Sequence, residues 1–246
     1  MFNFFGNNTR ANFPQNYFPI TVDMHSHILP GIDDGSPTIE TSLQLIEGLM
    51  ALGIKRSIAT PHIIGDMYRN DAATIGAALL QLQEALAQAN INFEVTAAAE
   101  YMLDSYFFEL LQSGQKLLTV KDNYLLTEFS YAAMPENREQ MAFLIINDGY
   151  SPILAHPERY AYYHNNFNQF HQLAELGFKL QINLLSLCGY YGKETERAAH
   201  FIVKEGLASF AGTDLHHERH LQALTDKAGI KKMAIAFENG LVNEWL

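Results

Sequence analysis

Cysteine is almost absent from this 246-residue chain, in which Cys188 stands alone. A disulfide within the chain is therefore impossible. Thiol phosphatases need an arginine six positions after their cysteine, at the end of a loop that binds phosphate, and Glu194 occupies that position here. The sequence excludes a cysteine-based phosphatase, and we expect Cys188 to be a small packed residue.

Basic residues are also scarce, since 16 Lys and Arg face 27 Asp and Glu and the net charge is −11. Proteins bind nucleic acid phosphates mainly through Lys and Arg, so we expect no nucleic-acid partner. The excess of acid has two interpretations. It either provides ordinary solubility or is partly neutralised by bound divalent cations.

Long hydrophobic runs are missing as well, because no apolar stretch approaches the ~20 residues of a membrane helix. The apolar start, Met1–Phe5, has no cationic flank and is not typical of a signal peptide. We therefore expect no membrane insertion and a location in the cytoplasm. Hydrophobic residues still make up 48% of the chain, which is enough for a substantial core.

The chain divides into an irregular arm over residues 1–19, rich in Asn and Phe, and a single domain over residues 20–246. In the domain, short β-prone runs alternate with helical patterns. The predicted strands are Ile20–Met24, Ser57–Thr60, Phe93–Ala98, Tyr124–Thr127, Pro152–Ala155, Leu180–Asn183 and Ser209–Gly212. The predicted helices are Thr38–Leu52, Ala72–Asn90, Asp104–Leu111, Pro135–Asp148, Phe167–Leu176, Glu194–Glu205 and a stretch from Glu218 onward.

This alternation favours an α/β fold with parallel strands and right-handed crossovers. Seven units over about 225 residues suit a TIM-like barrel that is short by one unit. The alternative is a doubly wound open sheet, which normally has a Gly-rich loop after its first strand. Here the residues that follow the first strand are His-Ser-His-Ile-Leu-Pro.

Residue types that bind metals follow nearly every predicted strand. They are His25 and His27, His62, Glu100, Glu128, His156, and Asp214 with His216. Only the strand that ends near Asn183 lacks such a residue. Because the carboxyl ends of parallel barrel strands meet on one face, we expect these side chains to converge there.

The spacing of His25 and His27 has a physical meaning, because residues i and i+2 of a strand point the same way. Both imidazoles can then reach one ion, although two histidines on a solvated sheet face would show the same spacing. Asp214 and His216 repeat it. Imidazoles and carboxylates without thiolates favour Mn, Fe, Zn or Mg ions over a structural zinc site. Eight or nine ligands imply two or three ions, and such clusters suit phosphoryl chemistry.

The loop after the first histidines carries Asp33 and Asp34 before Gly35, which is an ordinary turn signal on the face of the predicted site. Arg159 lies just past His156 and is a candidate phosphate ligand, with an ion pair to a nearby acid as the alternative. The remaining histidines are expected to be surface or packed residues. These are His164, His171, His200 and His220, while His217 should point away from His216 if the strand geometry persists.

Together these motifs resemble the polymerase-and-histidinol-phosphatase (PHP) superfamily. They are Asp23-x-His25-x-His27, Thr60-Pro61-His62, Glu100, Glu128, His156-Pro157-Glu158-Arg159-Tyr160 and Asp214-x-His216. The longer string from His25 to Gly35, with its Asp-Asp-Gly loop, is similar to the CpsB/CapC-type bacterial metal-dependent protein-tyrosine phosphatases. The resemblance extends from about Thr21 to the C-terminus.

The resemblance implies a distorted seven-stranded (β/α)7 barrel and two or three divalent ions, often manganese. The implied metal ligands are His25, His27, Asp34, His62, Glu100, Glu128, His156, Asp214 and His216. It implies that Arg159 binds phosphate and acts in catalysis with His156 and Asp214, whereas Asp33 caps the turn or hydrogen-bonds a ligand. The implied partner is a phosphotyrosine protein, the tail of a tyrosine autokinase in capsule or exopolysaccharide synthesis. The oligomeric state stays open.

Three rival functions remain. The first is hydrolysis of histidinol phosphate or another small phosphate ester at the same site. The second is a C–N hydrolase of the amidohydrolase type, which usually adds a lysine ligand that no predicted strand end supplies here. The third is a metal-binding interaction module without catalysis, which would keep the ions but not an open coordination position.

Overall fold

Parallel strands form the centre of the computed structural model, which describes residue 18, residues 20–237 and residue 243. Every ladder between its named strands is parallel. The strands in this part of the chain are β1 (Val22–Ser26), β2 (Arg56–Ala59), β3 (His62–Ile63), β4 (Glu94–Ala97), β5 (Glu100–Met102), β6 (Tyr124–Glu128), β7 (Ser151–Ala155), β8 (Lys179–Asn183) and β9 (Ala208–Gly212).

The strands belong to two sheets, with the orders β1-β2-β4 and β3-β5-β6-β7-β8-β9. β2 and β3 continue one another across Pro61, as β4 and β5 do across Ala98 and Ala99, so two of the seven predicted strands are each interrupted. Proline has no N–H to donate to a ladder, which accounts for the break after β2. The predicted α/β fold with a distorted seven-stranded TIM-like arrangement is confirmed.

The first and last strands approach one another at the active-site end. Ser26 forms a parallel bridge with Leu215, and the Asp214 N–H donates to the His25 carbonyl at 2.7 Å. Below them, the buried Asp23 carboxylate accepts hydrogen bonds from the backbone and hydroxyl of Thr213 at 2.9 and 2.5 Å. Asp23 therefore joins β1 to the segment after β9.

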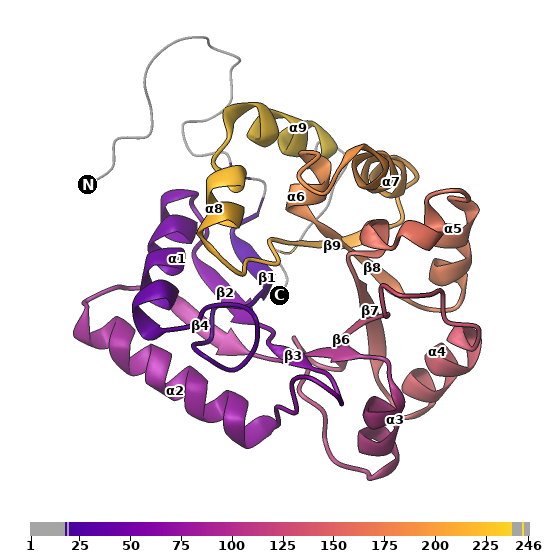
Figure 1. Ribbon diagram of the computed structural model, residues 1–246, viewed down its shortest axis with the longest axis horizontal. Helices are drawn as coiled ribbons and strands as arrows, with labels where there is room; N and C mark the ends of the chain where they lie inside the picture. The colour runs from indigo at the N-terminus through magenta and orange to yellow at the C-terminus, as the bar shows by residue number, and fades with distance from the viewer. Residues whose placement is uncertain (1–17, 19, 238–242, 244–246) are drawn as a thin grey trace.

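The helices lie around the strands (Figure 1). Those in the described part of the chain are α1 (Ile39–Ala51), α2 (Ala72–Gln88), α3 (Ser105–Gln112), α4 (Arg138–Asn147), α5 (Asn168–Glu175), α6 (Leu184–Leu187), α7 (Lys193–Lys204), α8 (Glu218–Leu224) and α9 (Lys227–Phe237), with 3-10 turns η1 (Pro157–Arg159) and η2 (Ala161–Tyr163). The helical pattern predicted from Glu218 onward is broken between α8 and α9, and the short α6 was not predicted.

Side-chain oxygens cap several of the helices. Thr38 accepts from the Thr41 N–H at the start of α1, and Asp71 and Thr74 form a capping box at the start of α2. Such caps satisfy backbone donors that a helix leaves unpaired, and each typically contributes about 1 kcal/mol. They fix where the helices begin and therefore how each strand end passes into its helix.

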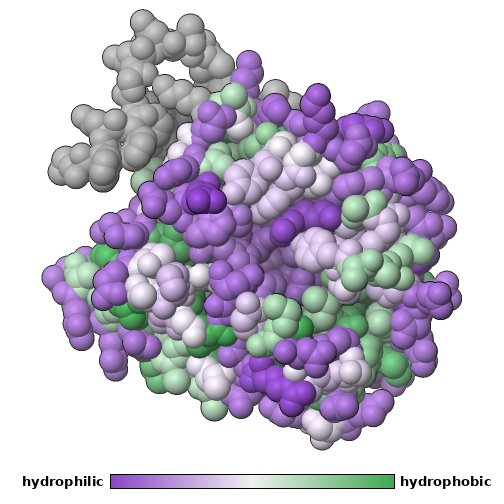
Figure 2. Space-filling view, viewed as in Figure 1, coloured by the Kyte–Doolittle hydropathy of each residue, from purple (hydrophilic) through white to green (hydrophobic). Residues whose placement is uncertain are grey.

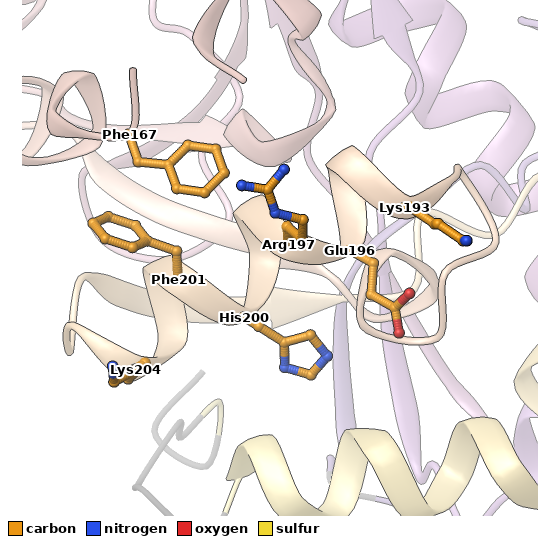
Figure 3. Close-up of a pocket in the computed structure, with 7 residues that line it drawn as sticks. All are labelled: Phe167, Lys193, Glu196, Arg197, His200, Phe201 and Lys204. Carbon is orange, nitrogen blue, oxygen red and sulfur yellow. The ribbon is translucent and has the colours of Figure 1, made fainter. Parts of the chain in front are cut away.

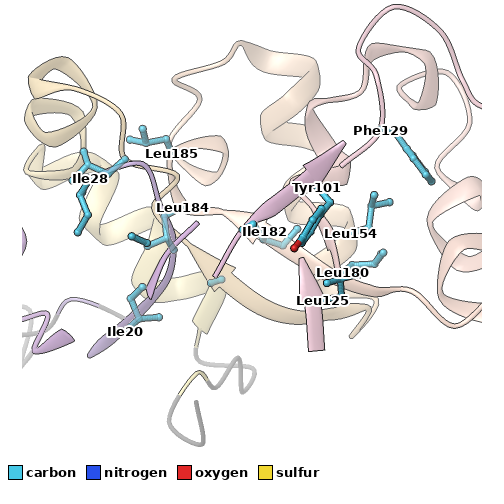
Figure 4. Packing of buried hydrophobic residues seen from close by; sticks show 14 of the residues in the cluster. Ile20, Ile28, Tyr101, Leu125, Phe129, Leu154, Leu180, Ile182, Leu184 and Leu185 are labelled. Atoms are coloured by element: carbon cyan, nitrogen blue, oxygen red, sulfur yellow. The ribbon is translucent and has the colours of Figure 1, made fainter. Parts of the chain in front are cut away.

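Two hydrophobic clusters make up the core. The larger packs strands against helices, and Figure 4 shows Leu125, Leu154 and Leu180 of three neighbouring strands within it. The smaller contains Val22 and Met24 of one sheet together with residues of the other, including Leu126, Ile153 and Phe210. Because it draws on both sheets, this cluster holds them together beneath the strand ends.

The predicted arm over residues 1–19 lies outside the described residues, apart from Phe18, which is buried in the larger cluster. The division into an arm and a single domain stays a prediction. In the described ranges, none of the helices combines the length and the apolarity that crossing a membrane requires.

Candidate metal centre

Glu100, at the start of β5, lies at the centre of a cluster of imidazoles and is fully buried. Its Oε2 atom is 3.1 Å from His25 Nε2, 3.3 Å from His27 Nε2 and 3.2 Å from His62 Nδ1. Its Oε1 atom is 3.0 Å from His156 Nε2. One carboxylate thus faces four histidines from three separate places in the sequence.

Ligand atoms around Glu100 form three overlapping groups, in each of which all atoms lie within 4.8 Å of one another. The groups are His25, His27, Glu100 and Asp214; His62, Glu100 and Glu128; and His27, Asp34, His62 and His216. His156 joins them through Glu100. The structure therefore brings together all nine side chains that the resemblance implies as ligands.

Unpaired polar atoms in this cluster show that a divalent ion fits the site. His62 Nδ1, Glu128 Oε1 and Asp214 Oδ1 are buried and have no hydrogen-bond partner among the described residues. His62 Nδ1 lies only 3.1 Å from Glu128 Oε1. Buried polar atoms without partners are costly, and a shared cation would satisfy such convergent lone pairs. The mixture of imidazole and carboxylate donors suits Mn, Fe, Zn or Mg.

Two of these residues have left-handed backbones. His156, after β7, has φ 35°, and Asp214, after β9, has φ 51°. Such a conformation costs roughly 1–3 kcal/mol for a residue other than glycine and persists where the surroundings impose it. Here it turns the chain sharply at the ends of two strands, so that both side chains enter the cluster.

Hydrogen bonds from outside the cluster orient its ligands. Asp33 Oδ2 is 2.7 Å from His27 Nδ1 and accepts from the His62 N–H at 3.1 Å, while Asp33 Oδ1 accepts from the Gly35 N–H. This arrangement fits the turn-capping and hydrogen-bonding role predicted for Asp33. Its neighbour Asp34 is 55% exposed and lies 3.5 Å from His62 Nε2, at the outer edge of the site.

The carboxylates and imidazoles shift one another's protonation. Burial disfavours the protonated form of His25, but the negative charges of Glu100 and Asp214 outweigh burial and raise its pKa to about 9. Burial raises the pKa of Asp214, yet the nearby His25 and His216 hold it well below its usual range. Burial and the positive charge of His27 lower the pKa of His216 to about 3. Without metal, the cluster therefore keeps protons on part of its imidazoles.

Arg159 borders the opening of the site. Its Nη1 atom is 2.6 Å from Asp214 Oδ2, so the alternative of an ion pair with a nearby acid is observed. The guanidinium also lies over the rings of Tyr191 and Tyr131, at 4.2 and 5.3 Å from their centroids. The Arg159 side chain remains 22% exposed and lines a cavity of about 220 Å³ with Asp34, Asp214, His216, His217 and His220.

Two histidines of this cavity were not predicted to belong to the site. His217 lines the same cavity as His216, and its exposed side chain caps α8. The expectation that it points away from His216 required the strand geometry to persist, and it does not, because β9 ends at Gly212 and Asp214 turns the backbone. His220 is buried and borders the same cavity, so it packs as predicted but next to the site.

The face seen in Figure 2 has hydrophilic residues around a central hollow, on the side where the loop between β1 and α1 lies in Figure 1. A larger groove of about 570 Å³ runs over α7 (Figure 3). Two of its charged residues form ion pairs, Arg197 with Glu194 and Glu196 with Lys232. The metal-binding groups found in the described residues include no residue of this groove, so the chemistry belongs at the strand ends.

The fold and the site define the class: an α/β protein that gathers histidines and carboxylates able to hold metal ions at the ends of its parallel strands. The sequence profile described as "Capsular polysaccharide synthesis, CpsB/CapC" matches residues 21–233. The chain therefore belongs to the CpsB/CapC family.

Known relatives agree with this assignment. The chain is 30% identical over 207 residues to the tyrosine-protein phosphatase YwqE of Bacillus subtilis, covering 84% of this chain and 82% of the relative. It is 26% identical over 204 residues to the tyrosine-protein phosphatase CpsB of Streptococcus pneumoniae, covering 80% of this chain and 83% of the relative.

Solved structures support the same fold. A chain from the crystal structures of YwqE and CpsB, described as metal-dependent tyrosine phosphatases, superposes with a TM-score of 0.75 at 27% identity, covering 90% of this chain and 96% of that one. A histidinol phosphate phosphatase from Lactococcus lactis matches with a TM-score of 0.55 at 15% identity, covering 91% and 94%. The second likeness shows the fold alone.

Proposed function

We propose that this protein is a metal-dependent protein-tyrosine phosphatase. The observation that carries the proposal is the convergence of buried ligand atoms on Glu100, with Arg159 at the opening. Three of those atoms lack any hydrogen-bond partner in the described part of the chain. The names of the relatives support phosphotyrosine protein as the substrate class. The histidinol phosphate phosphatase resembles this chain in fold alone.

Nine side chains would hold the ions: His25, His27, Asp34, His62, Glu100, Glu128, His156, Asp214 and His216. Glu100 would be shared between ions, because its two oxygens face different sets of imidazoles. When bound, divalent ions make water a strong nucleophile near neutral pH and neutralise charge on phosphoryl oxygens.

Arg159 binds the phosphoryl group from the side of the cavity. Its guanidinium lies between two tyrosine rings and is held at one end by Asp214, so its direction is fixed before substrate arrives. In the transition state of phosphoryl transfer, negative charge is spread over the phosphoryl oxygens. A donor that is already fixed in direction stabilises this charge, and such electrostatic stabilisation is usually the largest contribution to catalysis. The phenol of tyrosine, with a pKa of about 10, leaves without strong help from a general acid.

Finer features belong to the same proposal. They are two or three ions, manganese as the native one, the tail of a tyrosine autokinase as substrate, and the cytoplasm as compartment. The number of donor atoms and their oxygen and nitrogen chemistry support the first two. The family's link to capsular polysaccharide synthesis supports the third.

Chelation tests the proposal. Protein stripped of metal should lose hydrolysis of a phosphotyrosine peptide and regain it with Mn²⁺, whereas histidinol phosphate should be a poor substrate. His156→Ala and Asp214→Ala should each lose most turnover. Full activity after exhaustive stripping, or in the His156 variant, would overturn the proposal.

A further inference from the structure

Strand β8 contributes no predicted metal ligand, yet its inner side chains contact the metal centre. Leu180 and Ile182 pack in the larger hydrophobic cluster. Because side chains alternate along a strand, Gln181 and Asn183 project to the opposite side. Both are fully buried. Buried amides must form hydrogen bonds, and here those bonds reach two ligands.

Gln181 determines which nitrogen of His25 carries a proton. Its Oε1 atom is 2.9 Å from His25 Nδ1, and its Nε2 atom donates to the Ile182 carbonyl at 2.7 Å. The second bond settles the orientation of the amide, since a carbonyl accepts only from the NH₂ end. His25 Nδ1 therefore donates its proton to Gln181, which directs the Nε2 lone pair of the neutral ring toward Glu100, where a metal would lie.

Asn183 acts in the same way on Asp214. Its Oδ1 atom accepts from the Leu185 N–H at 2.8 Å, so its NH₂ end is the one that faces Asp214 Oδ2, at 3.0 Å. Arg159 donates to the same oxygen. Asp214 Oδ2 is thus fully engaged, and Oδ1 is left without a hydrogen-bond partner in the described residues, facing His25 and His27.

Glu158 holds the backbone of Asn183 in place. It is fully buried, and its Oε1 atom accepts from the Asn183 N–H at 2.9 Å. The end of β8 is therefore fixed both through its backbone and through the side chain of Asn183. Gln181 packs beside Gly212 of β9, where an added Cβ atom would lie 3.1 Å from Gln181 Nε2, so glycine leaves the room that the amide occupies.

We infer that Gln181 and Asn183 are positioning residues of the metal centre. Gln181 selects the His25 tautomer that binds metal, and Asn183 reserves one oxygen of Asp214 for the ion. The inference rests on the proposed function, since it assumes that the centre binds divalent ions. It adds a role for the only predicted strand end that lacks a ligand.

The test measures Mn²⁺ affinity directly, by competition with a fluorescent chelator on the full chain. Gln181→Met keeps the side-chain length and removes the acceptor, and Gln181→Glu restores it. Asn183→Asp keeps the oxygen that caps α6 and places an acceptor against Asp214. Gln83→Met is the matched control. Gln83 lies on α2, donates to the Val95 carbonyl at 2.9 Å and, within the described residues, hydrogen-bonds to no ligand of the cluster.

Gln181→Met and Asn183→Asp should each weaken Mn²⁺ binding about 10–100-fold, the usual effect of removing an outer hydrogen bond from a metal ligand. Gln181→Glu should bind more tightly than Gln181→Met, and Gln83→Met should match the wild type. Wild-type affinity in both β8 variants would overturn the inference while leaving the proposed function intact. A wild-type protein that binds no Mn²⁺ would overturn the metal centre itself. If Gln181→Met does not fold, Asn183→Asp decides.

Discussion

Replacing Gly212 with alanine should damage the metal centre although no ligand is replaced. Gly212 lies in β9 beside His25, and a Cβ atom at this position would be 2.7 Å from His25 Cβ. Non-bonded carbon atoms rest about 3.5–4.0 Å apart. The added methyl group must therefore displace the backbone of β1 or of β9, and with it the His25 imidazole.

The structure sets the size of this effect. Overpacking a close-packed interior costs about 1–3 kcal/mol, and each kcal/mol lowers the Tm of a chain of this size by about 2–4 °C. We expect the Tm of the metal-free Gly212→Ala protein to fall by about 2–12 °C. Because the His25–Gln181 hydrogen bond is disturbed, Mn²⁺ affinity should fall about 10–100-fold.

Thermal unfolding in a chelator and chelator competition for Mn²⁺ measure these two effects separately. Gly76→Ala is the matched control, because Gly76 lies inside α2 and a Cβ atom added there would meet nothing within 4 Å. That variant should gain about 0.5–1 kcal/mol from helix propensity and keep its metal affinity. A Gly212→Ala protein with the wild-type Tm and Mn²⁺ affinity would refute the close packing of His25 against β9.

Further predictions concern the protonation and charge of single groups. The pKa of His25 is raised to about 9 and the pKa of His27 well above its usual range, so Mn²⁺ must displace protons there, and its affinity should rise at least about tenfold per pH unit between pH 6 and 8. The raised pKa of His25 also stabilises the metal-free fold, fully below pH 6.5, and this contribution is lost as the pH rises through 9. A Mn²⁺ affinity that does not change with pH would be inconsistent with the raised pKa and with both predictions. Arg159→Met should lower turnover about 10²–10³-fold and weaken inhibition by inorganic phosphate while metal content stays constant, and lost metal would instead indicate a structural role through Asp214. Cys188→Ser should keep full activity, since burial raises the pKa of this thiol to about 11, and a large loss would revive a thiol mechanism.

The sequence predicted the order of strands and helices because their hydrophobic patterns are simple. It misplaced β1, predicted at Ile20–Met24 and found at Val22–Ser26. Its last two residues, His25 and Ser26, are polar, and the predicted strand stops before them. A polar ligand inside a strand has the same composition as a loop residue, so only the ladder to β2 reveals that the strand continues.

The candidate ligands were predictable because their positions after strands imply convergence. Gln181 and Asn183 were not, because an amide on the polar side of a strand looks the same whether it meets water or a histidine. The direction of His217 was unpredictable for another reason. It depended on whether strand alternation continues past Asp214, where a left-handed residue ends it, and no residue type other than glycine signals such a conformation reliably.

Anomalous diffraction from crystals grown with Mn²⁺ tests whether metal ions bind among the convergent histidines and carboxylates. We expect two or more anomalous peaks around Glu100, each about 2.0–2.3 Å from nitrogen or oxygen atoms of the nine convergent side chains. A map with no peak among these side chains, from protein that hydrolyses phosphotyrosine, would contradict it.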